Sequence, residues 1–163
     1  MDQTNPFVAK RRALQEQFMN LDALDDCPVG TGGVHHLVLI SSDLVATVGF
    51  YTQVLNMRLV KVVENRDDPT STHIFLDMGG GNMLAFFDFP EHGNAPAVRG
   101  IGAMHHVALK ATPQQYKGVI ANLKARDLDH DIHGDEVRGS VYFRDPDNIL
   151  LEVRSDDKER RTE

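Results

Sequence analysis

Hydrophobic and polar positions follow the same order of elements twice along this chain. Each half opens with an apolar run that predicts a strand, continues with apolar positions at helical spacing, and closes with three more strand-like runs. The predicted strands of the first half are 34–41, 58–64, 72–78 and 83–89, around a helix marked by Leu44, Val48, Tyr51 and Leu55. Those of the second half are 103–110, 130–137, 139–144 and 149–154, around a helix that starts at Thr112 and Pro113. The pattern predicts an α+β fold of two βαβββ modules.

A four-stranded sheet from either module would expose one apolar face. We expect the two sheets to pair as an incomplete barrel, which buries both faces and encloses a central cavity where the leading strands converge. The modules, 34–89 and 103–154, would form one domain over 34–154. Residues 1–33 are expected to be an N-terminal helical extension, with its helix at 6–24, and a linker rich in glycine; 155–163 would be a charged tail.

Composition narrows the class of protein. The 163 residues carry a net charge of −7 without a basic stripe, which argues against a nucleic-acid partner. The sequence shows no apolar stretch long enough to span a membrane and no signal peptide, so we expect no membrane partner. Its single cysteine, Cys27, excludes an intrachain disulfide and fits a reducing compartment, which predicts a cytoplasmic protein.

Paired histidines stand at the start of both leading strands, His35-His36 in the first half and His105-His106 in the second. Successive strand residues point to opposite faces, so only one histidine of each pair can face the enclosed cavity. Either His35 with His105 or His36 with His106 would converge there, and the pattern leaves both arrangements open.

A lone carboxylate, Glu152, lies in the last predicted strand between Leu151 and Val153. A buried carboxylate is costly without a partner. Arg144 or Arg154 is one possible partner, and a metal ion is another. Two histidines from equivalent strands with one carboxylate form the ligand set of an open metal site, so the sequence predicts a central metal cavity.

These features resemble the vicinal oxygen chelate superfamily, which includes glyoxalases, extradiol ring-cleaving dioxygenases and bleomycin or fosfomycin resistance proteins. The paired modules over 34–154 carry the resemblance, and the stretch 43–59 is similar to the family's first helix. The resemblance implies that His36, His106 and Glu152 bind a divalent metal. The first histidine of each pair then becomes an outward-facing or supporting neighbour.

The second module also resembles the extradiol dioxygenase signature, in which a histidine, a tyrosine and a proline turn lead to the glutamate ligand. Four positions fit its spacing: His133, Tyr142, the Asp145-Pro146 turn and Glu152. Two positions depart from its preferred residues: Asp131 and Asn148. Asparagine tolerates the same left-handed turn geometry as glycine, so the turn itself is still expected.

The resemblance implies roles for residues beside the metal. Tyr142 would hydrogen-bond a deprotonated diol oxygen, and His133 would donate a hydrogen bond next to it. His92, in the loop 90–100 and fourteen residues before His106, would be the acid/base histidine. An imidazole suits that task because its pKa lies near neutrality.

The fourth ligand of glyoxalase-like members has no counterpart in the first half. If Asn82 is aligned with Asn148, Phe86 falls opposite Glu152 and Ala85 lies one step away. Neither side chain can bind a metal. Three protein ligands leave coordination positions open, which suits Fe(II) that binds both an organic substrate and dioxygen.

The sequence therefore favours an Fe(II)-dependent extradiol-type dioxygenase that acts on a small aromatic diol. One alternative is a glyoxalase-like lyase or isomerase with Mn, Ni or Zn as Lewis acid, in which Asp88 or Glu91 would supply the fourth ligand. Another is a non-catalytic protein that sequesters a small molecule such as a drug. We also expect a homodimer, since members of the superfamily commonly dimerise by pairing or exchanging modules.

Overall fold

The computed structural model describes residues 6–19, 30–93, 95–135 and 137–156, and the chain divides into two compact units, 1–33 and 34–163. In the first unit the described residues form one helix, α1 (Pro6–Phe18). The predicted continuation of this helix to residue 24 and most of the predicted tail fall outside the described residues. No helix within the described ranges is long and apolar enough to cross a membrane.

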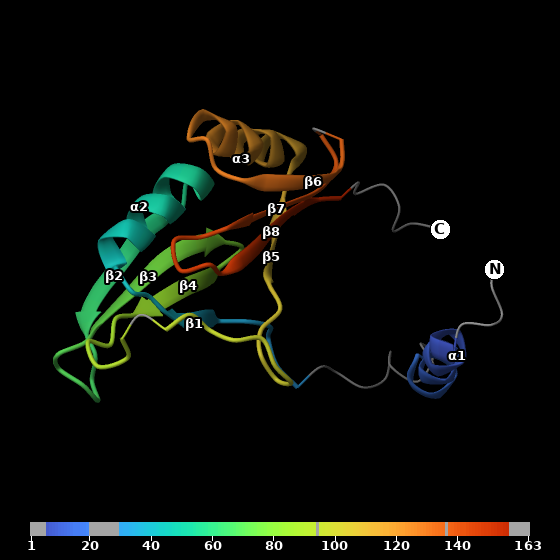
Figure 1. Ribbon diagram of the computed structural model, residues 1–163, viewed down its shortest axis with the longest axis horizontal. Coiled ribbons are helices and arrows are strands. Elements are labelled where there is room, and N and C mark those ends of the chain that lie inside the picture. The colour runs from blue at the N-terminus through green and yellow to red at the C-terminus, as the bar shows by residue number, and fades with distance from the viewer. Residues whose placement is uncertain (1–5, 20–29, 94, 136, 157–163) are drawn as a thin grey trace. The chain divides into compact units, whose positions relative to one another are not determined.

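The second unit contains the two predicted modules, each with a four-stranded mixed sheet (Figure 1). The first consists of β1 (His36–Ile40), α2 (Leu44–Leu55), β2 (Arg58–Glu64), β3 (Thr72–Gly79) and β4 (Asn82–Phe87), in the sheet order β1-β4-β3-β2. The second consists of β5 (Val107–Ala111), α3 (Pro113–Ala125), β6 (His130–Gly134), β7 (Gly139–Arg144) and β8 (Leu150–Ser155), in the order β5-β8-β7-β6. The α+β fold of two βαβββ modules is confirmed, and neither sheet closes into a barrel.

Local sequence explains where the elements begin and end. Asp43 caps α2 by accepting hydrogen bonds from the backbone N–H groups of Val45 and Ala46. Thr112 forms a capping box with Gln115 at the start of α3. Strand β6 ends at residue 134, earlier than the predicted 137, because Gly134 adopts a φ of +123° where a Cβ would lie 2.4 Å from a backbone oxygen.

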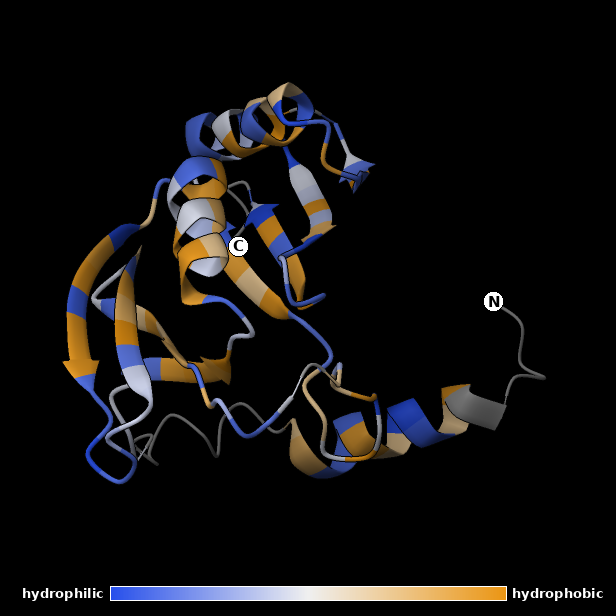
Figure 2. Cartoon of the chain, turned by 60° about the vertical axis from the view of Figure 1, so that its left-hand side comes forward, coloured by the Kyte–Doolittle hydropathy of each residue, from blue (hydrophilic) through white to orange (hydrophobic). Residues whose placement is uncertain are grey.

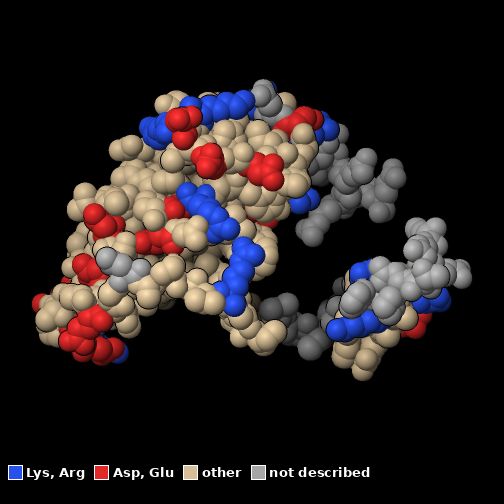
Figure 3. Space-filling model, in the orientation of Figure 1, with Lys and Arg blue, Asp and Glu red and all other residues tan. Residues whose placement is uncertain are grey.

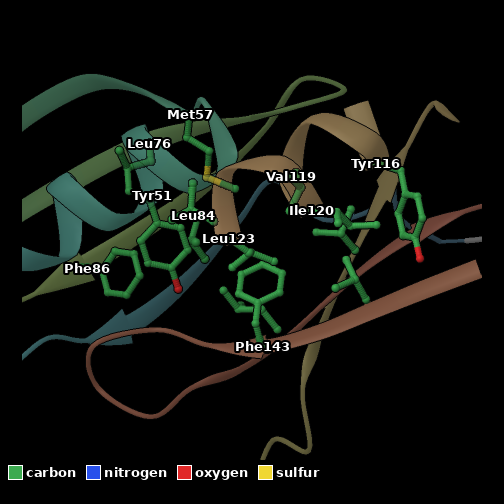
Figure 4. Packing of buried hydrophobic residues seen from close by; sticks show 14 of the residues in the cluster. Tyr51, Met57, Leu76, Leu84, Phe86, Tyr116, Val119, Ile120, Leu123 and Phe143 are labelled. Atoms are coloured by element: carbon green, nitrogen blue, oxygen red, sulfur yellow. The ribbon is translucent and has the colours of Figure 1, made fainter. Parts of the chain in front are cut away.

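The strands carry bands of hydrophobic and hydrophilic residues, as Figure 2 shows, and successive side chains point to opposite faces of the sheet. One face of each sheet packs against the helices, and the two modules share one buried hydrophobic cluster. Figure 4 shows members from both modules, among them Tyr51, Phe86, Leu123 and Phe143. Asn122 of α3 also donates a hydrogen bond to the Val54 carbonyl of α2 at 3.0 Å. The modules are therefore joined on their helical side.

A buried carboxyl group, Asp145, ties the turn before β8 to the first module. One of its oxygens accepts hydrogen bonds from the backbone N–H groups of Asp147 and Ile149 at 3.0 and 2.8 Å. The other accepts a hydrogen bond from the Tyr51 hydroxyl at 3.0 Å. Burial raises the pKa of Asp145 to about 6, although these hydrogen bonds oppose the shift.

The raised pKa of Asp145 predicts a pH-dependent contribution to stability. Because the folded state holds this proton more tightly than the unfolded state, the contribution is complete below pH 4 and is lost as pH rises through about 6. Asp145→Asn does not titrate, so the stability of the native chain should fall relative to this variant by up to about 3 kcal/mol between pH 4 and 7. Urea unfolding of both proteins at each pH measures the difference, and a constant difference across this range would contradict the prediction.

Candidate metal centre

Two of the three predicted ligands lie in direct contact. Strand β8 buries Leu151 and Val153 in the core and presents Glu152 on the opposite face. His106, immediately before the neighbouring strand β5, places Nε2 2.9 Å from Oε2 of Glu152. The glutamate side chain is 7% exposed and the histidine 30%, so a bound ion would meet both side chains at the edge of the buried region.

The surroundings of Glu152 favour its ionised form. Burial by itself would raise the pKa of this carboxyl group, but hydrogen bonds from Ser140 and Tyr142 and the adjacent His106 hold it below its ordinary value. The Ser140 hydroxyl donates to Oε1 at 2.5 Å, and Arg154 lies 3.9 Å from the same oxygen. Glu152 is thus a carboxylate at neutral pH, the form that binds a metal. Arg144, the other partner considered for it, instead donates to the Asn148 carbonyl.

An open hollow of about 560 Å³ lies beside this pair and is lined by residues of the second module alone. Its lining consists of His105, His106, Asp131, His133, Gly139, Ser140, Tyr142, Leu150 and Arg154. The Tyr142 ring stands edge-on to the rings of His106 and His133, with centroids 6.1 and 5.4 Å away. The tyrosine and histidine predicted from the signature therefore lie next to the pair.

The third predicted ligand, His36, lies on the sheet of the first module, where its ring centroid is 5.9 Å from that of Phe75. Within the described part of the chain, no three His, Cys, Asp or Glu side chains are close enough to hold one metal ion. The expected convergence of the two leading strands within one chain is therefore not found. The physical reason is that the modules join through α2, α3 and the shared core, and not across the faces that carry His36 and His106.

A row of aromatic rings crosses the sheet face that carries His36. Centroids are separated by 4.1 Å from Phe75 to His73, 3.8 Å from His73 to Phe87, 5.3 Å from Phe87 to Phe89, and 4.9 Å from Phe89 to His92. His92, the predicted acid/base residue, is therefore placed on the first module and does not line the hollow.

His73 occupies the middle of this row, and sequence reasoning missed it. Burial lowers its pKa, with the nearby His36 and Lys61 acting in the same direction, so its imidazole is neutral at pH 7. Its Nε2 atom is buried without a hydrogen-bond partner among the described residues. Strand alternation, which puts His73 on the same face as Phe75, was the signal that could have identified it.

The strand pairing corrects the predicted alignment of the two modules. Val38 pairs with Ala85 as Ala108 pairs with Glu152, so Ala85 and not Phe86 occupies the position of the glutamate. Phe86 faces the core, 5.2 Å from the Tyr51 ring (Figure 4). The prediction was wrong by one residue because the turns before the two last strands differ in length: β3 and β4 are joined by a tight glycine turn, and β7 and β8 by a longer loop.

The corrected register still leaves the first module without a fourth ligand at this position, since an alanine methyl group cannot bind a metal. The two other carboxylates considered lie elsewhere. Asp88 accepts a hydrogen bond from the Thr72 backbone at 2.6 Å, and Glu91 is exposed in the following loop.

The same register reveals how the two modules differ. Glu152 pairs with Tyr142 in β7 as Ala85 pairs with Phe75 in β3. Ser140 pairs with Arg154 as His73 pairs with Phe87. One module therefore offers a polar face with a carboxylate, and the other offers an aromatic face. In the view of Figure 3, acidic side chains gather at the lower left and basic side chains cross the centre, while both kinds lie along the top.

Comparison with known proteins places the chain among proteins of related architecture. The model of the Glyoxalase/Bleomycin resistance protein/Dioxygenase superfamily matches residues 33–153. "Putative ring-cleaving dioxygenase MhqA" of Bacillus subtilis (strain 168) is 32% identical over 77 residues, 43% of this chain and 24% of that protein. MhqO of the same organism, with the same descriptive name, is 28% identical over 129 residues, 76% of this chain and 40% of that protein. The chain thus spans less than half the length of these curated relatives.

A solved structure shares the fold. A variant of FosX, a fosfomycin resistance protein from Listeria monocytogenes, superposes with a TM-score of 0.61 at 22% identity, over 82% of this chain and 99% of that chain. That crystal contains Mn(II) and 1S,2S-dihydroxypropylphosphonic acid. At this identity the likeness establishes the fold alone.

The corrected register predicts how strongly two neighbouring phenylalanines affect stability. Phe86→Ala removes a fully buried ring and should lower the free energy of unfolding by about 3–5 kcal/mol. Phe87→Ala, on the opposite and only half-buried face, should cost less. Denaturant unfolding of both variants measures the difference. A larger loss of stability for Phe87→Ala than for Phe86→Ala would instead support the alignment that places Phe86 opposite Glu152.

Proposed function

Because the chain belongs to the Glyoxalase/Bleomycin resistance protein/Dioxygenase superfamily, we propose that it is a metal-dependent dioxygenase that cleaves the ring of a small aromatic diol. The proposed metal is Fe(II), and the proposed ligands are His36, His106 and Glu152. The observation that carries the proposal is the contact of His106 with an ionised, buried Glu152 at the edge of an open hollow.

The ligand set supports oxygen chemistry over Lewis-acid chemistry. Two histidines and one carboxylate leave adjacent positions open on the metal, and Ala85 at the mirrored position adds no ligand. The descriptive names of MhqA and MhqO point in the same direction. Superfamily members bind divalent metals, as the Mn(II) complex of FosX illustrates.

The chain's own residues would hold the diol and manage its protons. Fe(II) bound at this centre would supply a site where the diol and dioxygen meet. Tyr142, whose ring stands edge-on to the rings of both His106 and His133, would hydrogen-bond a diol oxygen beside the metal. His133 would support that oxygen from the next strand, with its own Nε2 held 3.2 Å from Asp131. His92, which lies at the end of the aromatic row of the first module, would accept a proton from the substrate or donate one to it.

Two halves of this site lie on separate sheet faces, and we propose that a second copy of the chain unites them. In a homodimer, the first-module face of one copy would cover the second-module face of the other. His36 and His92 of the second copy would then join His106, Glu152 and Tyr142. This arrangement would supply the third ligand that the described residues of one chain do not bring to the pair.

The glyoxalase-like alternative requires a fourth ligand. Ala85 offers none, Asp88 accepts a hydrogen bond from the Thr72 backbone, and Glu91 is exposed in the loop after β4. The sequestering alternative predicts binding of a small molecule without any dependence on a metal. Both alternatives are distinguished from the proposed activity by metal content and oxygen consumption.

The first test is metal content together with oxygen uptake. Protein purified without air and reconstituted with Fe(II) should bind about one iron per chain and consume oxygen with members of a catechol and hydroquinone panel. His106→Ala should abolish both, because it removes a ligand, while His130→Ala on the outer strand β6 should change neither. Elemental analysis and an oxygen electrode give the readouts. Oxygen uptake without bound metal, or turnover of a hemithioacetal with Zn(II) or Ni(II), would overturn the proposal.

The second test asks whether the site is shared between two copies. His36→Ala and His106→Ala should each be inactive alone. If each site takes His36 from one copy and His106 from the other, mixing the two variants after mild dissociation should restore about a quarter of the wild-type sites, since half the dimers are mixed and each holds one intact site. Each variant mixed with itself is the control. If the mixture stays inactive although mass measurement verifies that subunits have exchanged, the whole site lies within one chain.

A further inference from the structure

A side-chain contact between neighbouring histidines occurs in both modules with the same geometry. Nδ1 of His105 lies 2.7 Å from Nδ1 of His106, and Nδ1 of His35 lies 2.8 Å from Nδ1 of His36. The ring centroids are 5.0 Å apart in each pair, and the ring planes meet at 78° and 81°. The repeat of distance and angle at corresponding positions of two different sheets indicates a feature of the site and not an accident of one strand.

We propose that His105 and His35 are positioning residues that fix the rotation and the proton of the histidines that bind the metal. This inference rests on the proposed function, because it takes His106 and His36 as ligands. In this role neither residue is a ligand of the metal, although His105 also lines the hollow beside it. Each would act through its neighbour, as the hydrogen-bonding partners of metal-bound histidines do in other sites.

The contacts of His106 determine which of its nitrogens can bind the ion. Nε2 faces Glu152 at 2.9 Å, so this nitrogen and the carboxylate can share one cation. A nitrogen that binds a metal carries no proton, so the ring proton of a neutral, metal-bound His106 must be on Nδ1. The acceptor placed to receive that N–H is Nδ1 of His105.

Without an ion the pair holds its protons differently. In the tautomer that carries its proton on Nε2, His106 would donate to Glu152, and its Nδ1 would accept from His105. A metal ion at Nε2 would exclude that tautomer. The hydrogen bond between the two rings would then run from Nδ1–H of His106 to Nδ1 of His105.

The exposure of the first histidine of each pair supports a role outside the core. His35 and His105 are exposed, and among the described residues the only side-chain hydrogen bond given by either is to its neighbour. Replacing an exposed side chain seldom unfolds a protein, so the positioning role can be separated from stability.

Metal affinity measured on the full chain tests the inference. Zn(II) serves as the probe because it is diamagnetic and accepts the same nitrogen and oxygen ligands, and competition with a chromophoric chelator gives its affinity. His105→Phe keeps a ring but removes the acceptor, and it should weaken Zn(II) binding about 10–100-fold. His105→Asn places an amide oxygen near the former Nδ1 and should recover most of the affinity. His130→Phe is the matched control and should bind as the native chain does.

Imidazole nitrogen NMR provides a readout that a purely structural role would not change. In the native chain and in His105→Asn, Zn(II) should move the His106 proton from Nε2 to Nδ1 and hold it in a hydrogen bond. His105→Phe should lose that hydrogen-bonded Nδ1 signal while its thermal unfolding remains that of the native chain. His35→Phe and His35→Asn should repeat both results at His36.

The outcomes separate this inference from the function on which it rests. If the native chain and His106→Ala bind Zn(II) equally weakly, the proposed metal site fails. If the native chain binds Zn(II) and His106→Ala does not, but His105→Phe retains the native affinity and tautomer, the metal site stands and the positioning role is overturned. Failure of His105→Asn to recover affinity would also overturn it, because the role depends on the acceptor.

Discussion

A single hydrophobic core shared by the two modules is the constraint on which the rest of the structure depends. Helices α2 and α3 and the buried cluster beneath them engage one face of each sheet, and the Tyr51–Asp145 hydrogen bond links the modules on that side. Alternate residues of the central strands are thereby committed to packing. All the candidate chemistry must lie on the other face, and His106, Glu152, Tyr142 and His36 are found there.

The duplication has diverged at the positions that matter for chemistry. At equivalent positions of the two sheets, the second module has Glu152 and Tyr142 where the first has Ala85 and Phe75. Methyl and phenyl groups cannot replace a carboxylate or a hydroxyl as ligand or hydrogen-bond donor, so the modules are no longer interchangeable. One face can hold a cation and the oxygens of a ligand, while the other can pack against an aromatic ring.

This division gives the proposed homodimer a physical reason. With the proposed ligand set neither face would be complete alone. The first has Ala85 where the second has Glu152, and among the described residues the second brings no further histidine to His106 and Glu152. Bringing the two together from different copies would enclose a diol between a metal-binding wall and an aromatic wall. It would also shield the reaction from bulk water, which strengthens each electrostatic contact in the site.

The sequence by itself determined the repeated module, most element boundaries, and the polar composition of the second-module face. Period-two alternation, capping residues and the spacing from His133 to Glu152 are local properties, and local sequence records them. Only the tertiary structure decided that Ala85 mirrors Glu152, that Ser140 binds the carboxylate, that His73 fills the aromatic row, and that His36 lies apart from His106. Those facts depend on turn lengths and on how helices pack between modules, and such contacts between distant segments leave no periodic signal in the chain.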